Sequence, residues 1–438
     1  MGKYDDIDLL VWDAVFGDDE TKQYCRYLIR KKAQEKGIGP ASVYELYKAI
    51  GQGKIAGFTV PAMNMRGMTY DLARAAFRAA KKTKAAAIIF EIARSEMGYT
   101  DQQPSEFVAS VLGAALKEGY SYPVFIQGDH FQVKEKGYKA DPEKELAGVK
   151  KLIKDSIEAG FYQIDLDTST LVDITKATVP EQQKGNCEVA AILTKYIRSL
   201  EPAGITVALG GEIGEIGGKN STEEELRAYV SGYNALLGSG IKGISKIAVQ
   251  TGTTHGGIPL PDGSIAKVKL DFETLEKLSK ISRQEYGLAG CVQHGASTLP
   301  SELFDKFPKT GTAEIHLATE FQNMIFDHPK FPSELKNKIY DYLKTNAASE
   351  RKEGETDTQF FYKTRKKAWG QFKKDTWSID KSVKDEIMSV LEKKFVFLFE
   401  KLNVLNTDKT VAGFVKTVNV EIKKPAISGQ EEKFEGAD

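Results

Sequence analysis

The sequence predicts an α/β fold, a closed (β/α)8 TIM barrel with a helical extension at each end. Between about residues 55 and 330, short apolar runs alternate with longer segments of helical periodicity. This alternation predicts parallel strands joined by helices, and eight strands are the number that closes a barrel. Because an open, doubly wound sheet produces the same alternation, periodicity alone leaves that second topology open.

The eight predicted strands are runs of apolar and β-branched residues bounded by Gly, Pro or Asp. They lie at 55–63, 86–92, 122–129, 161–167, 204–212, 243–250, 289–294 and 312–319. The predicted helices between them carry apolar residues on one face, with Pro or capping residues at their starts and Gly at their ends. They lie at 69–84, 104–119, 142–160, 221–238 and 270–287.

The two ends of the chain have a different pattern from the middle. Residues 1–50 are predicted to form two helices before the first strand, and the barrel is expected at 51–330. Residues 331–438 are predicted to form a helical, partly basic extension whose last thirty residues are a strand or a loose polar tail. We therefore expect one barrel with an extension on each side.

Composition excludes several classes of protein. The 438 residues include 61 Lys and Arg and 61 Asp and Glu, so no basic excess indicates a nucleic-acid partner. No apolar run reaches the roughly 18 residues of a membrane span, and the acidic N-terminus does not resemble a secretory signal. Three widely spaced cysteines, Cys25, Cys187 and Cys291, favour a reducing compartment. We expect a cytoplasmic protein.

The histidines are few and fall at the ends of predicted strands. Of the five, His130 and His255 follow the third and sixth strands, His294 ends the seventh, His316 lies in the eighth, and His328 comes after the eighth. Catalytic groups of such barrels lie at the C-terminal ends of the strands. Three imidazoles from different strands are typical of a catalytic zinc site with open positions. A single histidine of this kind is more often a hydrogen-bonded structural residue, but three on one rim favour a metal.

Four motifs carry a resemblance to a known family: IQGDHF (126–131), GGEIGEIGG (210–218), TGTTHGG (251–257) and QHGAS (293–297). In this order and spacing they resemble the signatures of the class II, zinc-dependent ketose-bisphosphate aldolases. The resemblance implies a sugar-phosphate substrate, with fructose 1,6-bisphosphate cleaved to dihydroxyacetone phosphate and glyceraldehyde 3-phosphate. It also implies Zn²⁺, a further divalent or monovalent cation, and a homodimer or homotetramer.

The same resemblance implies roles for particular residues. His130, His255 and His294 would bind the zinc, and Asp129 would transfer the proton of the C4 hydroxyl. Because alternate strand residues point to opposite faces, Asp129 and His130 can both reach the site only if the strand end is locally twisted. Glu212 matches a carboxylate that binds metal in a second position. Further candidates for orienting the metal site or contacting substrate and phosphate are Asn64, Asp167, Gly256, Gly295, Ser297, His316 and Thr319.

A second phosphate of the substrate would require a cation. The candidates are Arg66, Arg94 and the basic segment around Arg365. Arg365 lies in FYKTR, a stretch similar to one through which class II aldolases bring an arginine to a neighbouring subunit. The alternative is that this basic run is a solvated helix face.

The chain departs from the family pattern at four places. The replacements are Gln127 for the first His of H-x-D-H, Pro259 for a Lys, His316 and Ala318 for an Asn and an Asp, and Lys219 and Asn220 for acids that include the α-proton base. Glu215 or Glu223 could replace that base. The metal residues are therefore kept while the substrate contacts are changed.

Three functions follow from this pattern. The first is a class II aldolase, and the second is a metal-dependent epimerase or an aldolase for another keto-sugar. The third is a non-catalytic accessory subunit of an aldolase complex. The third is considered because EIARSEMGYTDQQPSEF (91–107), GDHF (128–131) and AGFYQIDLDTS (159–169) resemble accessory subunits of tagatose-bisphosphate aldolase.

Overall fold

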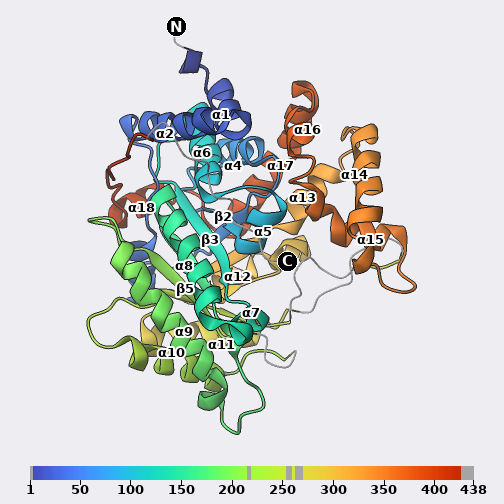
Figure 1. Cartoon of the computed structure of the whole chain (residues 1–438). Coiled ribbons are helices and arrows are strands. Elements are labelled where there is room, and N and C mark those ends of the chain that lie inside the picture. Colours follow the sequence, from blue (N-terminus) through green and yellow to red (C-terminus); the bar gives the residue numbers. More distant parts are fainter. Residues whose placement is uncertain (1–2, 215–218, 253–258, 262–269, 426–438) are drawn as a thin grey trace.

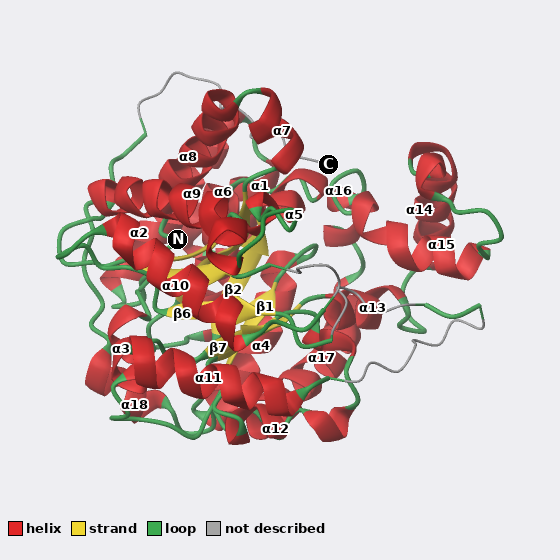
Figure 2. Ribbon diagram, turned by 90° about the horizontal axis from the view of Figure 1, so that it is seen from below, coloured by secondary structure: helices red, strands yellow, loops and turns green. Residues whose placement is uncertain are grey.

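The computed structural model describes residues 3–214, 219–252, 259–261 and 270–425. At its centre is a closed barrel of eight parallel strands in sequence order, surrounded by helices (Figures 1 and 2). The barrel closes because β1 pairs with both β2 and β8. The strands are β1 (Val60–Asn64), β2 (Ile89–Ala93), β3 (Phe125–Gln132), β4 (Gln163–Asp167), β5 (Ala208–Glu212), β6 (Lys246–Val249), β7 (Cys291–Gln293) and β8 (Glu314–Leu317). The predicted barrel is confirmed and the open sheet is excluded.

The helices that follow the strands agree with the predicted ones, with a few additions. They are α4 (Thr69–Thr83), α5 (Arg94–Tyr99), α6 (Pro104–Glu118), α7 (Glu135–Ala140), α8 (Pro142–Ala159), α9 (Val179–Leu200), α10 (Glu223–Leu237), α11 (Phe272–Tyr286), α12 (Lys306–Lys309) and α13 (Thr319–Phe326). The sequence analysis missed α9, whose first turns are polar and contain Gly185. Its apolar face begins only at Cys187, although the capping box of Thr178 and Glu181 marks its start.

The N-terminal extension contains three α-helices where two were predicted. They are α1 (Ile7–Phe16), α2 (Asp19–Glu35) and α3 (Tyr44–Gly51). Aspartates cap α1 and α2, whereas Val43 precedes α3 and makes no capping hydrogen bond. Helix α3 therefore lacks a start signal in the sequence. It forms because tertiary packing buries Leu46, Tyr47 and Ile50.

The C-terminal extension is helical, as predicted, and one of its helices joins the barrel wall. Its helices are α14 (Ser333–Asn346), α15 (Asp357–Thr364), α16 (Lys373–Trp377), α17 (Lys381–Lys401) and α18 (Asp408–Phe414). Helix α17 packs against α4 and α13, whereas α14 and α15 project to one side (orange in Figure 1, right in Figure 2). Residues 415–425 form neither helix nor strand.

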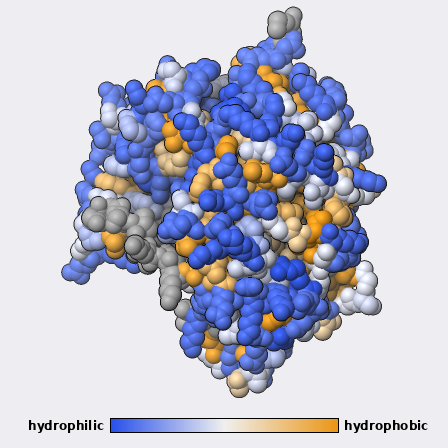
Figure 3. Space-filling model, turned by 180° about the vertical axis from the view of Figure 1, so that it is seen from behind, coloured by the Kyte–Doolittle hydropathy of each residue, from blue (hydrophilic) through white to orange (hydrophobic). Residues whose placement is uncertain are grey.

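The surface of the described residues is mixed in character. Figure 3 shows one face on which hydrophilic residues predominate and apolar residues occur in small groups. Among the helices that the structure describes, none combines the length and the apolar character that a membrane crossing requires.

Candidate active site

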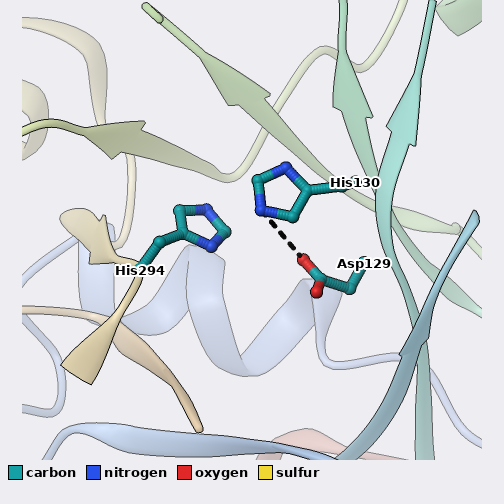
Figure 4. Close-up of side chains that lie close together, drawn as sticks. All are labelled: Asp129, His130 and His294. Atoms are coloured by element: carbon teal, nitrogen blue, oxygen red, sulfur yellow. Dashed lines mark ion pairs between the residues drawn. The ribbon is translucent and has the colours of Figure 1, made fainter. Parts of the chain in front are cut away.

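An irregularity at the end of β3 turns two consecutive side chains toward the barrel mouth. The register between β3 and β4 shifts between Gly128 and Phe131, and His130 has a φ of 42°. A positive φ is uncommon outside glycine, and a bulge of this kind redirects the side chains around it. Asp129 and His130 therefore lie together at the mouth (Figure 4). This irregularity is the local twist that the sequence led us to expect at the end of the strand.

Histidines and carboxylates from four strands meet at this point. His130 Nδ1 lies 2.8 Å from Glu212 Oε1, at the end of β5, and 3.3 Å from Asp167 Oδ2, at the end of β4. His294 follows β7 directly, and its Nε2 lies 3.4 Å from the same Glu212 oxygen. Two groups of side chains bring their ligand atoms close together. In the first, one ligand atom each of Asp129, His130 and His294 are within 4.8 Å of one another. The second consists of His130, Asp167 and Glu212, at the same spacing.

The chemistry of these donors fits a divalent metal ion. Burial and the positive charges of His316 and His130 lower the pKa of His294 to about 3, so this ring is neutral at pH 7. Burial opposes the charged form of His130 as well, but Asp129 and Glu212 outweigh it and raise the pKa of His130 well above its usual value. A metal ion competes with such a proton. Neutral imidazoles and carboxylates are the usual ligands of catalytic zinc.

Two of the predicted site residues lie in a segment that the structure does not describe. His255, the third predicted zinc ligand, and Gly256, a predicted phosphate contact, lie outside the described residues. Their roles stay predictions.

A cavity of about 300 Å³ opens beside Asp129 and His294. Its lining brings together five residues that were predicted from distant parts of the sequence. They are Asn64 from β1, Gly295 and Ser297 after β7, and His316 and Thr319 at the end of β8. A second cavity of about 370 Å³ shares His130 and His294 with the first and includes Asp167, Ser169 and Glu212. The two histidines therefore border both cavities.

The Asp129 carboxylate is held on both of its oxygens. Asn64 Nδ2 donates to Oδ2 at 3.2 Å, and Nδ1 of His316 lies 3.0 Å from Oδ1. Burial favours the neutral acid, but the charges of His130 and His316 outweigh it and hold the pKa of Asp129 well below its usual range. At neutral pH this group is therefore a buried, ionised carboxylate.

One rim of the first cavity is cationic. Arg66 pairs with Glu96 at 3.3 Å and donates from Nη1 to the Tyr99 hydroxyl at 2.9 Å. Lys366, from the C-terminal extension, lies 5.8 Å from the centre of the Tyr99 ring. Burial and the neighbouring Arg66 lower the pKa of Lys366. Arg94 also lines the cavity. An anionic substrate group placed here would relieve the repulsion between Arg66 and Lys366.

Arg365 does not line this cavity. It pairs with Asp327 at 2.7 and 2.9 Å, and its guanidinium packs over Phe326 and Tyr362. The residue of that segment that lines the cavity is Lys366. A contact between Arg365 and a neighbouring subunit stays a prediction.

Of the two suggested replacements for the α-proton base, one can be placed. Glu223 lines neither cavity and forms ion pairs with Arg227 and Lys277. Glu215 lies outside the described residues, so its role stays a prediction. Asn220, which replaces one of the family's acids, donates to Asp271 at 3.0 Å.

Glu96, the carboxylate that pairs with Arg66, was not predicted. Its position just after the second strand was the signal that could have found it.

Beneath the mouth, the barrel interior contains charged groups where branched apolar residues are usual. Lys246 Nζ lies 3.0 Å from Asp165, forms a close ion pair with Glu314 and donates to Gln127 Oε1 at 2.8 Å. All four side chains are buried. Because buried charges are tolerated when they are paired, this layer depends on Lys246 and on His316, whose Nε2 lies 2.7 Å from Glu314 and 3.5 Å from Asp165.

The Lys246→Met substitution should lower the free energy of unfolding by about 3–5 kcal/mol, because it removes the lysine that pairs with the buried carboxylates of Asp165 and Glu314. Urea denaturation followed by circular dichroism measures this loss. The matched control is Lys139→Met, which removes an exposed lysine paired with Glu135 and should leave the unfolding midpoint unchanged. A similar loss in both variants would show that the buried pair has no special role.

A family model and a relative match the chain. Residues 44–390 match the family model described as fructose-bisphosphate aldolase class-II. A protein of Coccidioides immitis (strain RS), whose name assigns it provisionally to the fructose-bisphosphate aldolases, is 26% identical over 273 residues. This alignment covers 61% of the chain and 76% of the relative.

Solved structures of low sequence identity share the fold. One is described as a probable tagatose 6-phosphate kinase from Sinorhizobium meliloti 1021, with a TM-score of 0.54 and 16% identity over 81% of this chain and 98% of that chain. Another is a fructuronate-tagaturonate epimerase from Cohnella laeviribosi, with a TM-score of 0.51 and 13% identity over 90% of this chain and 86% of that chain. At these identities, the likeness shows the architecture alone.

Proposed function

The chain belongs to the class II fructose-bisphosphate aldolase family, and on that premise we propose that it catalyses a reversible, zinc-dependent aldol cleavage of a ketose bisphosphate. The substrate we propose is fructose 1,6-bisphosphate, which yields dihydroxyacetone phosphate and glyceraldehyde 3-phosphate. The observation that carries the proposal is the cluster of Asp129, His130 and His294 beside a cavity with a cationic rim. We further propose a cytoplasmic homodimer or homotetramer, as expected from the sequence.

His130 and His294 would hold the divalent ion, with His255 as the third ligand that the resemblance implies. When bound, such an ion supplies Lewis acidity toward the ketose carbonyl and its neighbouring hydroxyl. Asp129 removes the proton of the C4 hydroxyl as the C3–C4 bond breaks, and returns it in the direction of condensation. Asn64 orients this carboxylate through Oδ2.

The remaining lining residues suit a phosphorylated ketose. Gly295, Ser297 and Thr319 line the first cavity, where a backbone amide and two hydroxyls offer donors to a phosphate. Arg66 and Lys366 supply positive charge, and Arg66 Nη2 donates to the Thr319 hydroxyl at 3.5 Å. These donors support an anionic substrate.

Turnover with and without a chelator tests the proposal. Purified protein should release triose phosphate from fructose 1,6-bisphosphate, lose that activity with a chelator and regain it with Zn²⁺. Epimerisation of a keto-sugar without triose phosphate release would replace the aldolase with the epimerase reading. Failure to bind zinc or to turn over any sugar phosphate, together with co-purification of a shorter partner, would identify an accessory subunit.

The Lys366→Met substitution should raise KM for fructose 1,6-bisphosphate by about 10- to 100-fold, because a hydrogen bond to a charged group contributes about 1.5–3 kcal/mol. KM for fructose 1-phosphate should stay the same, because this sugar lacks the phosphate on C6, here called the distal phosphate. The control is Lys367→Met, since this neighbouring lysine pairs with Glu350 at 2.6 Å. Equal effects on the two sugars would remove Lys366 from the recognition of the distal phosphate.

A further inference from the structure

His316 on β8 lies among buried carboxylates, with a hydrogen-bond partner at each ring nitrogen. Nδ1 is 3.0 Å from Asp129 Oδ1 and 3.3 Å from Glu91 Oε1. Nε2 is 2.7 Å from Glu314 Oε1 and 3.5 Å from Asp165 Oδ2. Carboxylate oxygens accept hydrogen bonds, so both nitrogens of His316 face acceptors. The two shortest contacts join Asp129 to Glu314 through one ring.

The lower end of this bridge is firmly held. Glu314 Oε1 accepts from Gln127 Nε2 at 2.7 Å and forms the close ion pair with Lys246. Its second oxygen accepts a short hydrogen bond from the Tyr47 hydroxyl of α3. Both oxygens of Glu314 are thus bound by residues from three separate elements, and the side chain is fully buried. Glu314 is a fixed point in the barrel interior.

The Asp129 carboxylate, at the upper end of the bridge, is held by fewer contacts than Glu314. Asp129 lies in the irregular segment of β3, where the regular strand geometry does not set its direction. Apart from His316, Asn64 Nδ2 donates to its Oδ2 at 3.2 Å, and His130 Nε2 lies 3.6 Å from its Oδ1 (Figure 4). Without His316, Oδ1 would lose its contact at hydrogen-bond distance and keep only the longer ion pair with His130.

We propose that His316 is a positioning residue that holds the Asp129 carboxylate in its orientation for proton transfer by tying it to the Lys246–Glu314 ion pair. The proposal rests on the proposed function, in which Asp129 transfers the proton of the C4 hydroxyl. It also explains why a histidine replaces the asparagine expected at this position: the longer ring spans the gap between two carboxylates at different depths. His316 thus acts through Asp129.

The test is the His316→Gln variant, whose amide can donate to one carboxylate but cannot bridge both. We expect kcat to fall by about 10- to 100-fold, the usual effect of removing a partner that orients a functional group. KM should change by less than about threefold, since the binding contacts remain. Zinc content and the absorption spectrum of the Co²⁺-substituted protein should match the wild type. His328→Gln is the matched control, because His328 lies outside both cavities among the described residues.

A double-substitution cycle separates action through Asp129 from an independent role. If His316 acts through Asp129, then Asp129→Asn and the double variant Asp129→Asn, His316→Gln should have the same residual kcat. Multiplied losses would overturn the proposal, as would a changed Co²⁺ spectrum, which marks a metal ligand, or a raised KM with unchanged kcat, which marks a substrate contact. If His316→Gln does not fold, His316→Asn is measured in the same way.

A crystal structure of zinc-loaded His316→Gln keeps this inference separate from the assignment of the reaction. We expect the Asp129 carboxylate to be displaced or to occupy several orientations while His130 and His294 stay in place. An unmoved Asp129 would overturn the positioning role whatever the substrate. If the wild type does not cleave ketose phosphates but Asp129 moves in the variant, the proposed reaction fails and the positioning of Asp129 stands.

Discussion

The Asp129→Asn substitution should lower kcat by about 10²- to 10⁴-fold, the range by which a positioned acid–base group accelerates proton transfer. The amide has nearly the same shape as the carboxylate and can still accept a hydrogen bond through its oxygen, but it cannot take up the C4 hydroxyl proton. Steady-state kinetics with fructose 1,6-bisphosphate measure the loss. Zinc content should be unchanged, because His130 and His294 remain.

The control for this substitution is Asp173→Asn, which changes an aspartate whose side chain accepts hydrogen bonds from Thr175 in an exposed turn. It should have the kcat of the wild type. A loss of less than tenfold in Asp129→Asn would move the proton-transfer role to another residue. A loss of zinc in the same variant would show instead that Asp129 is a ligand.

The His294→Ala substitution should abolish stoichiometric zinc binding and reduce turnover to that of the chelated wild type. The alanine removes a neutral ring nitrogen whose neighbours, Glu212 and His130, face the same point. Elemental analysis of the dialysed, zinc-reconstituted protein gives the metal-to-protein ratio, and the triose phosphate assay gives the turnover.

His328→Ala provides the matched histidine control, since His328 lines neither of the two cavities described at the mouth. It should retain zinc and activity. Full zinc content in His294→Ala would contradict the assignment of His294 as a ligand. Full activity in the absence of bound zinc would contradict the metal-dependent mechanism altogether.

Much of the barrel could be predicted because each strand and most helices carry their own signals. Apolar runs bounded by turn residues gave the eight strands, and proline or capping residues located α6, α8 and α10. Helix α3 has no such signal, since it is stabilised by the burial of Leu46, Tyr47 and Ile50 under the rest of the fold. Local sequence cannot reveal a helix that forms for tertiary reasons.

The site shows the same division between local and distant information. Strand order alone brings His130 and His294 to one mouth, so their proximity could be predicted. The bulge that turns Asp129 and His130 in the same direction could only be inferred as a requirement, because alternation argues against it. The sequence could not show which of Arg365 and Lys366 lines the cavity. Both lie in a short 3₁₀ turn, η6 (Arg365–Ala368), in which adjacent residues point in different directions.

The packing of α17 also bears on how the chain can be divided. This helix begins at Lys381, far along the chain from the last strand, which ends at Leu317, yet it buries Leu391, Phe395 and Phe399 in the same apolar core as the barrel helices (Figure 1). The Phe395 ring lies 4.9 Å from that of Phe321 in α13. A fragment that stops near residue 330 would therefore leave a strip of its wall bare and prone to self-association. Expression of the barrel alone calls for a boundary beyond residue 401, although the repeat of strand and helix is complete long before it.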